Sequence, residues 1–135
     1  MITYALDTNI ITYILKKNTI VINHYITETK KGNSFIIPPL VSYEIKRGLK
    51  YIQAFKKMSA FDEFYAQFEN IDFDIQVWDK AADIYVDLRK KGIPIEDADI
   101  LIAAYCLVHD YVLVTNNTKH FERIEGLKYV NWMIA

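Results

Sequence analysis

Three acidic side chains in this sequence lie on segments that a folded sheet would bring together. Asp7 follows a short strand-like run, Glu44 lies inside a predicted helix, and Asp99 begins a strongly apolar helix. Two carboxylates near one sheet edge repel each other, and their pKa values rise unless a cation lies between them. Mg²⁺ and Mn²⁺ suit such a place, because they prefer oxygen ligands together with water and a substrate phosphate. The chemistry that this pattern predicts is metal-assisted hydrolysis of a phosphodiester.

Each of these residues also has an ordinary structural interpretation. Asp7 at a strand-to-helix junction is a typical N-cap, and taken alone that role is the favoured one. Asp97 or Asp99 would complement the dipole of the helix that follows them. Glu44 is a good helix former, and Asn117 is a common turn residue. The metal-site hypothesis therefore rests on all of them occurring together.

The rest of the chain alternates strand and helix patterns. The spacing of apolar residues predicts strands at 2–6, 34–37, 71–73, 111–115 and 127–132, helices at 8–16, 19–31, 39–49, 50–69, 75–91 and 96–109, and a short helix or turn at 120–124. Such alternation predicts a parallel sheet covered by helices on both faces. In these folds, sites lie outside the carboxyl ends of the strands, which is where Asp7 falls.

Composition narrows the class of protein. The 135 residues are 52% hydrophobic and 24% charged, which predicts one globular domain spanning 1–135. The net charge is -1, so binding of nucleic acid would need a local basic patch or metal ions. Cys106 is the only cysteine, which excludes a disulfide within the chain. The sequence shows no signal peptide and no membrane-length apolar run, so we expect a cytoplasmic protein.

Four segments carry a family resemblance: "ALDTNIITYILK", "VSYEIKRG", "IEDADILIAA" and "LVTNNTKHFERIEGL". Together and in this order they resemble the PIN-domain ribonucleases, specifically the VapC toxins of bacterial toxin–antitoxin pairs. The resemblance covers nearly the whole chain. It implies a three-layer α/β/α fold with a central, mostly parallel sheet.

The resemblance also implies roles for the acidic residues. Asp7, Glu44 and Asp99 match the family's three acidic catalytic positions, and Asp7 and Asp99 match its metal ligands. The fourth position of the family falls at Asn117, whose amide brings no charge, so whether one or two metal ions bind stays open.

Other polar residues match the surroundings of the family's pocket. Asn9 and Thr115 match residues that line it. Asp97 is either an outer acidic residue of the site or only a helix cap, and the two interpretations have similar weight. His120 stands where the family often has an acidic residue. A general-acid role is one interpretation for His120, but a surface histidine is the favoured one.

The activity that the resemblance implies is Mg²⁺-dependent endonucleolytic cleavage of RNA, with Mn²⁺ as a substitute metal. VapC-like toxins attack tRNA or ribosomal RNA and so stop translation, and the "TNN…F" ending is similar to members that act on initiator tRNA. The resemblance further implies a homodimer and inhibition by a VapB-like antitoxin. No membrane partner is expected.

Two surfaces are candidates for binding partners. Lys46, Arg47 and Lys50 would contact RNA phosphates near the site, or would simply form a solvated helix C-terminus; the two interpretations are balanced. The predicted helix 50–69 is rich in aromatic residues, more than a small core contact needs. Part of it could form a groove for an antitoxin helix, which predicts partly exposed aromatic side chains there.

Two other functions compete with the nuclease. The first is a catalytically weak nucleic-acid-binding or interaction module of the same fold, which Asn117 leaves open. The second is a phosphotransfer or phosphatase domain. Those enzymes commonly use a second Asp two residues after the first, and here that position is Asn9, which counts against them.

Overall fold

The computed structural model describes residues 1–134 and contains four strands and seven helices within them. In chain order these are β1 (Thr3–Leu6), α1 (Thr8–Leu15), α2 (Thr19–Lys30), β2 (Ser34–Ile36), α3 (Pro39–Tyr51), α4 (Phe55–Tyr65), α5 (Ile75–Lys90), α6 (Asp97–His109), β3 (Val112–Val114), α7 (Thr118–Phe121) and β4 (Tyr129–Val130). Most of the predicted elements are therefore present. Among residues 1–134, no helix is long and apolar enough to cross a membrane.

The four strands form one parallel sheet in the order β2-β1-β3-β4. β1 pairs with β2 on one side, with Ala5 opposite Ile36, and with β3 on the other side, with Leu6 opposite Val114. The chain leaves β1 first toward β2 and later returns on the opposite side as β3. The order of the strands therefore reverses beside β1, which places the crevice of this sheet at the carboxyl end of β1.

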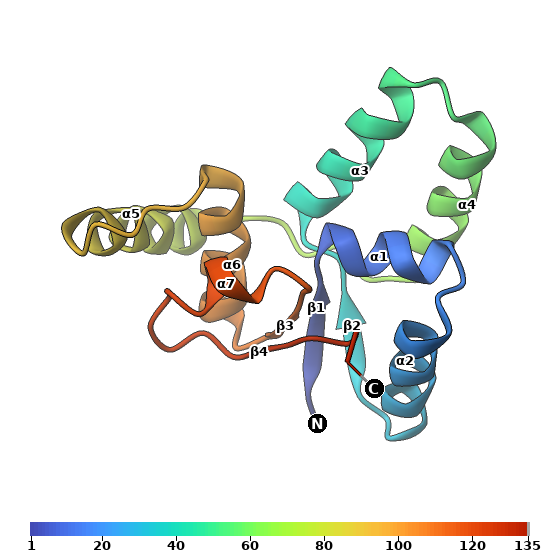
Figure 1. Ribbon diagram of the computed structural model, residues 1–135, viewed down its shortest axis with the longest axis horizontal. Helices are drawn as coiled ribbons and strands as arrows, with labels where there is room; N and C mark the ends of the chain where they lie inside the picture. Colours follow the sequence, from blue (N-terminus) through green and yellow to red (C-terminus); the bar gives the residue numbers. More distant parts are fainter. Residues whose placement is uncertain (135) are drawn as a thin grey trace.

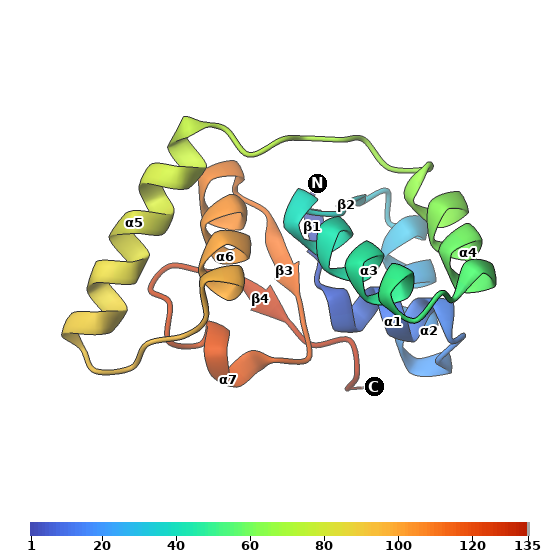
Figure 2. The ribbon, with the colours of Figure 1, turned by 90° about the horizontal axis from the view of Figure 1, so that it is seen from above.

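Helices cover both faces of this sheet. Viewed from above, α5 and α6 lie on one side of the strands, and α1, α2, α3 and α4 lie on the other (Figure 2). Figure 1 shows the upper end of β1 between α1 and α3 on one side and α6 and α7 on the other. The predicted three-layer α/β/α architecture with a parallel sheet is confirmed.

The helix α6 forms the centre of the core, as its apolar sequence predicts. Six of its residues are buried: Ile100, Ile102, Ala103, Ala104, Tyr105 and Cys106. Ala103 and Ala104 are fully buried, and such small side chains allow close packing of the helix. Burial also raises the pKa of the Cys106 thiol, so the only cysteine is an inert core residue.

The predicted helix over 50–69 is wrong in one respect. α3 continues to Tyr51, the chain turns, and α4 begins at Phe55. Gln53 adopts a left-handed backbone with φ 55, and its neighbour Ala54 donates from its amide to the carbonyl of Leu49 at 3.0 Å. A left-handed residue cannot continue a right-handed helix, so the turn divides the segment despite its continuous apolar spacing.

The predicted strand over 71–73 is also wrong, because this segment joins α4 to α5 without entering the sheet. The apolar side chains of Ile71 and Phe73 pack against the core instead. The hydroxyl of Tyr105 donates to the carbonyl oxygen of Ile71 at 2.6 Å, so a side chain satisfies a backbone group that a sheet would otherwise pair.

Two phenylalanines of α4 test how this helix contributes to stability. Phe61 is 1% exposed and Phe55 is 68% exposed. We expect Phe61→Ala to lower the free energy of unfolding by about 3–5 kcal/mol, because it removes a buried ring and leaves a cavity. Phe55→Ala should change it by less than about 1 kcal/mol. Urea unfolding measures both, and equal losses would contradict the packing described for α4.

Candidate active site

Asp7 is the centre of the candidate site, and it lies directly after β1. Its amide donates to the carbonyl oxygen of Val114 at 3.0 Å, which extends the pairing of β1 with β3 by one residue. Its carboxylate is the N-cap of α1, because Oδ1 accepts from the amide of Thr8 at 2.8 Å. Its second oxygen, Oδ2, accepts hydrogen bonds from other residues of the site. The capping role and the site role are therefore both present in one side chain.

Two polar residues hold the second oxygen of Asp7. The hydroxyl of Thr115, fully buried after β3, donates to Oδ2 at 2.8 Å, and the amide of Asn9 donates to it at 3.3 Å. Asn9 also accepts at 2.9 Å from the backbone amide of Asn116, so it links the start of α1 to the loop after β3. Both residues lie where the family resemblance places pocket residues.

A second group surrounds Asp99, in the first turn of α6. His120 of α7 places Nδ1 2.8 Å from Asp99 Oδ2 and 2.9 Å from Asn117 Nδ2. The backbone amide of Asn117 donates to the Thr115 hydroxyl at 3.0 Å, which connects this group to the one around Asp7. His120 therefore contacts Asp99 while its side chain is 37% exposed, so both interpretations of this histidine stay predictions. Nδ1 of His120 can donate a hydrogen bond to Asp99 only when that nitrogen carries a proton.

Glu44 approaches the site from α3. Its Oε1 accepts from the hydroxyl of Thr8 at 3.1 Å, and its Oε2 lies 3.8 Å from the guanidinium of Arg47. Thr8 directly follows Asp7, so this bond fixes Glu44 to the same strand end. The sequence analysis did not single out Thr8 as a site residue, although its position beside Asp7 in the "DTN" segment could have indicated that role.

The charges of these carboxylates oppose one another. Burial raises the pKa of the Asp7 carboxyl, whose residue is only 5% exposed. Hydrogen bonds from Thr115 and Thr8 act in the opposite direction, and the negative charges of Asp99 and Glu44 raise the pKa further. Among residues 1–134, no lysine or arginine forms an ion pair with Asp7 or Asp99. The site therefore has excess negative charge that a cation would neutralise.

The donor set fits a hard divalent cation with few protein ligands. Among the described residues, no three acidic, histidine or cysteine side chains converge closely enough to enclose a metal ion alone. Mg²⁺ commonly takes only one or two carboxylates and completes its shell with water and phosphate. Asp7 and Asp99 can supply those carboxylates, whereas a closed structural site would need more protein ligands.

The remaining predicted residues lie around this centre. Asp97 is the first residue of α6 and is exposed, and the N-cap position of that helix belongs to Glu96, so the interpretation of Asp97 as the cap is wrong. A role for Asp97 in the site stays a prediction. Lys46, Arg47 and Lys50 lie together along one side of α3, next to Glu44.

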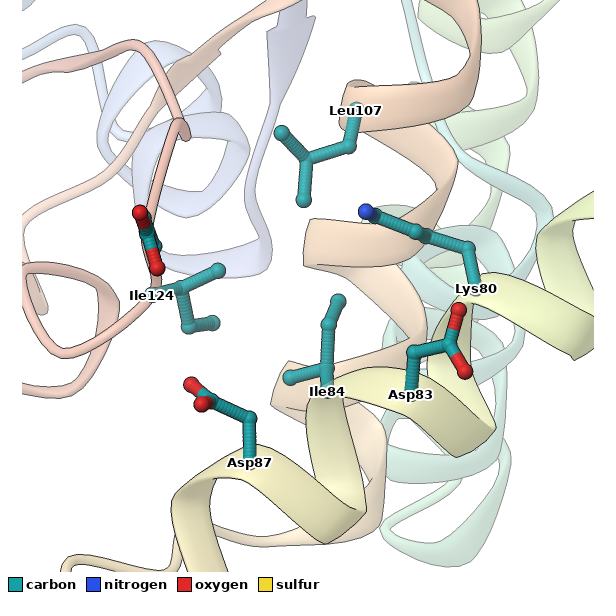
Figure 3. Close-up of a pocket in the computed structure, with 7 residues that line it drawn as sticks. Lys80, Asp83, Ile84, Asp87, Leu107 and Ile124 are labelled. Carbon is teal, nitrogen blue, oxygen red and sulfur yellow. The ribbon is translucent and has the colours of Figure 1, made fainter. Parts of the chain in front are cut away.

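A separate hollow of about 240 Å³ lies between α5, α6 and the segment after α7. Figure 3 shows Lys80 and Asp87 of α5 reaching toward it, opposite Leu107 of α6 and Ile124. None of the residues that surround Asp7 lines it. It is distinct from the candidate active site.

The parallel sheet with acidic residues at the carboxyl end of its central strand is the architecture of a PIN domain. The sequence model of the PIN domain matches residues 4–127. The chain therefore belongs to the PIN-domain family.

Its relatives within that family are VapC ribonucleases. The chain is 32% identical to ribonuclease VapC2 of Rickettsia felis, covering 96% of this chain and 97% of that protein. It is 27% identical to the tRNA(fMet)-specific endonuclease VapC of Salmonella typhimurium, covering 98% of this chain and 99% of that protein.

Solved structures of VapBC complexes also resemble this chain. The toxin chain of VapBC2 from Rickettsia felis, crystallised bound to a promoter DNA fragment, superposes with a TM-score of 0.89 at 31% identity, covering 97% of this chain and 99% of the other. The DNA-bound VapBC complex of Salmonella typhimurium gives 0.86 at 26% identity, covering 98% and 99%.

The electrostatics of Asp7 predict how stability depends on pH and metal. Because its pKa is raised in the folded state, its contribution to stability is present at low pH and is lost as pH rises through that pKa. In EDTA, the Tm of the wild type relative to that of Asp7→Asn should therefore fall as the pH rises above the ordinary carboxyl pKa of 3.8.

Added Mg²⁺ should raise the Tm of the wild type at pH 8, because a ligand that binds only the folded state stabilises it. It should have little effect on the Tm of Asp7→Asn. Thermal unfolding followed by circular dichroism measures both. Equal pH dependence of the two proteins, together with an equal response to Mg²⁺, would contradict the site described around Asp7.

Proposed function

We propose that this protein is a Mg²⁺-dependent endoribonuclease toxin of the VapC type, with Mn²⁺ as a substitute metal. The observation that carries the proposal is the buried Asp7 carboxylate at the end of the central strand, whose pKa is raised by burial and by the negative charges of Asp99 and Glu44. The relatives named as a ribonuclease and as a tRNA(fMet)-specific endonuclease support RNA as the substrate.

Each residue of the site has its own role in the proposed reaction. Asp7 and Asp99 would hold the metal ion, which when bound neutralises charge on the scissile phosphate and lowers the pKa of a coordinated water. Thr115 and Asn9 keep one oxygen of Asp7 in place, so that the carboxylate does not turn away. Glu44, held by Thr8, stays available to accept a proton near the phosphate.

Asn117 bears on how many metal ions this site holds. Its amide oxygen can accept a hydrogen bond or contact a cation, but it adds no negative charge. With Asp7 and Asp99 as the only carboxylate ligands proposed for the metal, and an amide at Asn117, the site is better matched to one tightly bound ion than to two. The same observation favours the second candidate function, a catalytically weak module that binds nucleic acid without cleaving it efficiently.

RNA would approach along α3. Lys46, Arg47 and Lys50 give that helix a basic side next to Glu44, in a chain whose net charge is -1. Each phosphate contact from a lysine or arginine adds affinity by releasing counterions. The relative named as a tRNA(fMet)-specific endonuclease supports a tRNA substrate. A ribosomal RNA substrate, cleavage in the cytoplasm and inhibition of translation are further parts of the proposal.

A VapB-like antitoxin would bind across α1, α3 and α4. A hollow of about 240 Å³ between these helices has the apolar residues Leu15, Ile45 and Leu49 in its lining and Lys16 and Lys57 among its polar residues. The solved neighbours are complexes of a toxin with its antitoxin, which supports such a partner.

Exposed apolar side chains support partners on two further faces. Tyr51 and Phe55, at the turn between α3 and α4, are exposed, as the antitoxin-groove hypothesis predicts, whereas Phe61 is buried. Ile75 and Trp78 are exposed at the start of α5 and support assembly as a homodimer.

Cleavage assays on purified protein test the proposed nuclease. With Mg²⁺ or Mn²⁺, the wild type should cleave total tRNA, and EDTA should abolish the reaction. Asp7→Asn, Asp99→Asn and Glu44→Gln should each reduce the rate by about 100-fold or more, since each removes a charged group from the reaction centre. Gel electrophoresis of end-labelled RNA measures the rate.

Asp110→Asn is the matched control for these variants. Asp110 is exposed and has a left-handed backbone that asparagine tolerates. This variant should cleave like the wild type. Cleavage that survives both EDTA and Asp7→Asn would contradict the mechanism, and RNA binding without any cleavage would favour the weak module.

A further inference from the structure

The solvent side of α3 combines basic and aromatic side chains beside the candidate active site. Six residues at helical spacing line a shallow hollow of about 410 Å³: Pro39, Ser42, Tyr43, Lys46, Arg47 and Lys50. This lining has three cationic side chains and no acidic one. Since the whole chain is slightly acidic, the positive charge is local to this helix.

Tyr43 is the unusual residue of this surface. It is 56% exposed, and the guanidinium of Arg47 lies 5.1 Å from the centre of its ring. The tyrosine and the arginine therefore form one exposed pair of flat groups, one helical turn apart. Flat aromatic and guanidinium groups are the surfaces on which proteins stack unpaired nucleobases.

The pair is held at a defined place relative to the reaction centre. Arg47 lies 3.8 Å from Glu44 Oε2, and Glu44 Oε1 accepts from Thr8 beside Asp7. Tyr43 also directly precedes Glu44 in the helix. A base that stacks on Tyr43 would thus belong to a nucleotide next to the phosphate that reaches the carboxylates.

We propose that Tyr43 and Arg47 form a stacking platform for an unpaired nucleobase of the RNA beside the scissile phosphate, while Lys46 and Lys50 contact neighbouring phosphates. The inference rests on RNA as the substrate of the proposed function. It adds a specificity rule, because a base in a continuous duplex is stacked on its neighbours and is not available to the platform.

Binding of RNA in EDTA tests the platform without cleavage. The probes are a fluorescein-labelled oligoadenylate and the same strand paired with oligouridylate, followed by fluorescence anisotropy. Tyr43→Ala should weaken binding of the single strand by about tenfold, the range expected for loss of one stacked base. Tyr43→Phe should retain most of the affinity, because it keeps the ring. Neither variant should change the weaker binding of the duplex.

The chain offers a matched control for this variant. Tyr85 of α5 is 43% exposed and has Arg89 one turn later, 4.9 Å from its ring, but it lies away from the carboxylates. Tyr85→Ala should leave single-strand binding unchanged. This control separates an effect that depends on the position of Tyr43 from the general effect of losing an exposed tyrosine–arginine pair.

The contribution of charge is separable from that of stacking. Lys46→Gln and Lys50→Gln should each reduce the slope of log affinity against log salt by about 0.7 for the single strand. Arg47→Lys keeps the charge but loses the plane, so it should weaken binding while leaving that slope unchanged.

Several outcomes would overturn the platform. They are equal affinity of Tyr43→Ala and the wild type, equal losses in Tyr43→Ala and Tyr85→Ala, and equal losses for single strand and duplex. Tyr43-dependent binding of oligoglutamate but not of RNA would likewise assign this face to an acidic protein partner. If Tyr43-dependent RNA binding occurs without cleavage, the platform stands and the nuclease fails. If Asp7-dependent cleavage occurs and Tyr43→Ala has no effect, the nuclease stands and the platform fails.

Discussion

The structure depends on a carboxylate buried at the end of its central strand. Asp7 is almost inaccessible, and burying a charged group is unfavourable unless hydrogen bonds or an opposite charge compensate it. Thr8, Asn9 and Thr115 each donate to it, and the amide of Asp7 itself pairs with the neighbouring strand. The start of α1 and the end of β3 therefore meet at one carboxylate, and the position of both depends on it.

These hydrogen bonds hold the Asp7 carboxylate in place, but they come from neutral groups and do not neutralise its negative charge. Asp99 and Glu44 add negative charge from α6 and α3. Among the described residues, the guanidinium of Arg47 lies 3.8 Å from Glu44, and the ring of His120 lies 2.8 Å from Asp99. A fold selected only for stability would place a neutral residue at this strand end, since replacement of buried charges by neutral groups is often neutral or stabilising. We propose that a cation compensates this charge during function. The basic side of α3 lies next to this acidic centre, and its positive charge attracts phosphates toward the centre.

Much of this could be predicted from the sequence, since strand ends and helix starts follow from local patterns. The position of Asp7 after a short apolar run and of Asp99 before a fully apolar helix predicted their meeting at one sheet edge. Local patterns do not determine how a short helix is oriented, so the contact of His120 with Asp99 was not predictable. The division of α3 from α4 at Gln53 depends on one left-handed residue within continuous apolar spacing, which periodicity cannot detect.

We propose that the acidic end of the central strand is a divalent cation site. Crystals grown with Mn²⁺ test it directly, because the metal's anomalous scattering locates it independently of any assay. We predict an anomalous peak in contact with carboxylate oxygens of both Asp7 and Asp99, with water completing its shell. The absence of a peak at saturating Mn²⁺, or a peak elsewhere with none between these two residues, would contradict the account.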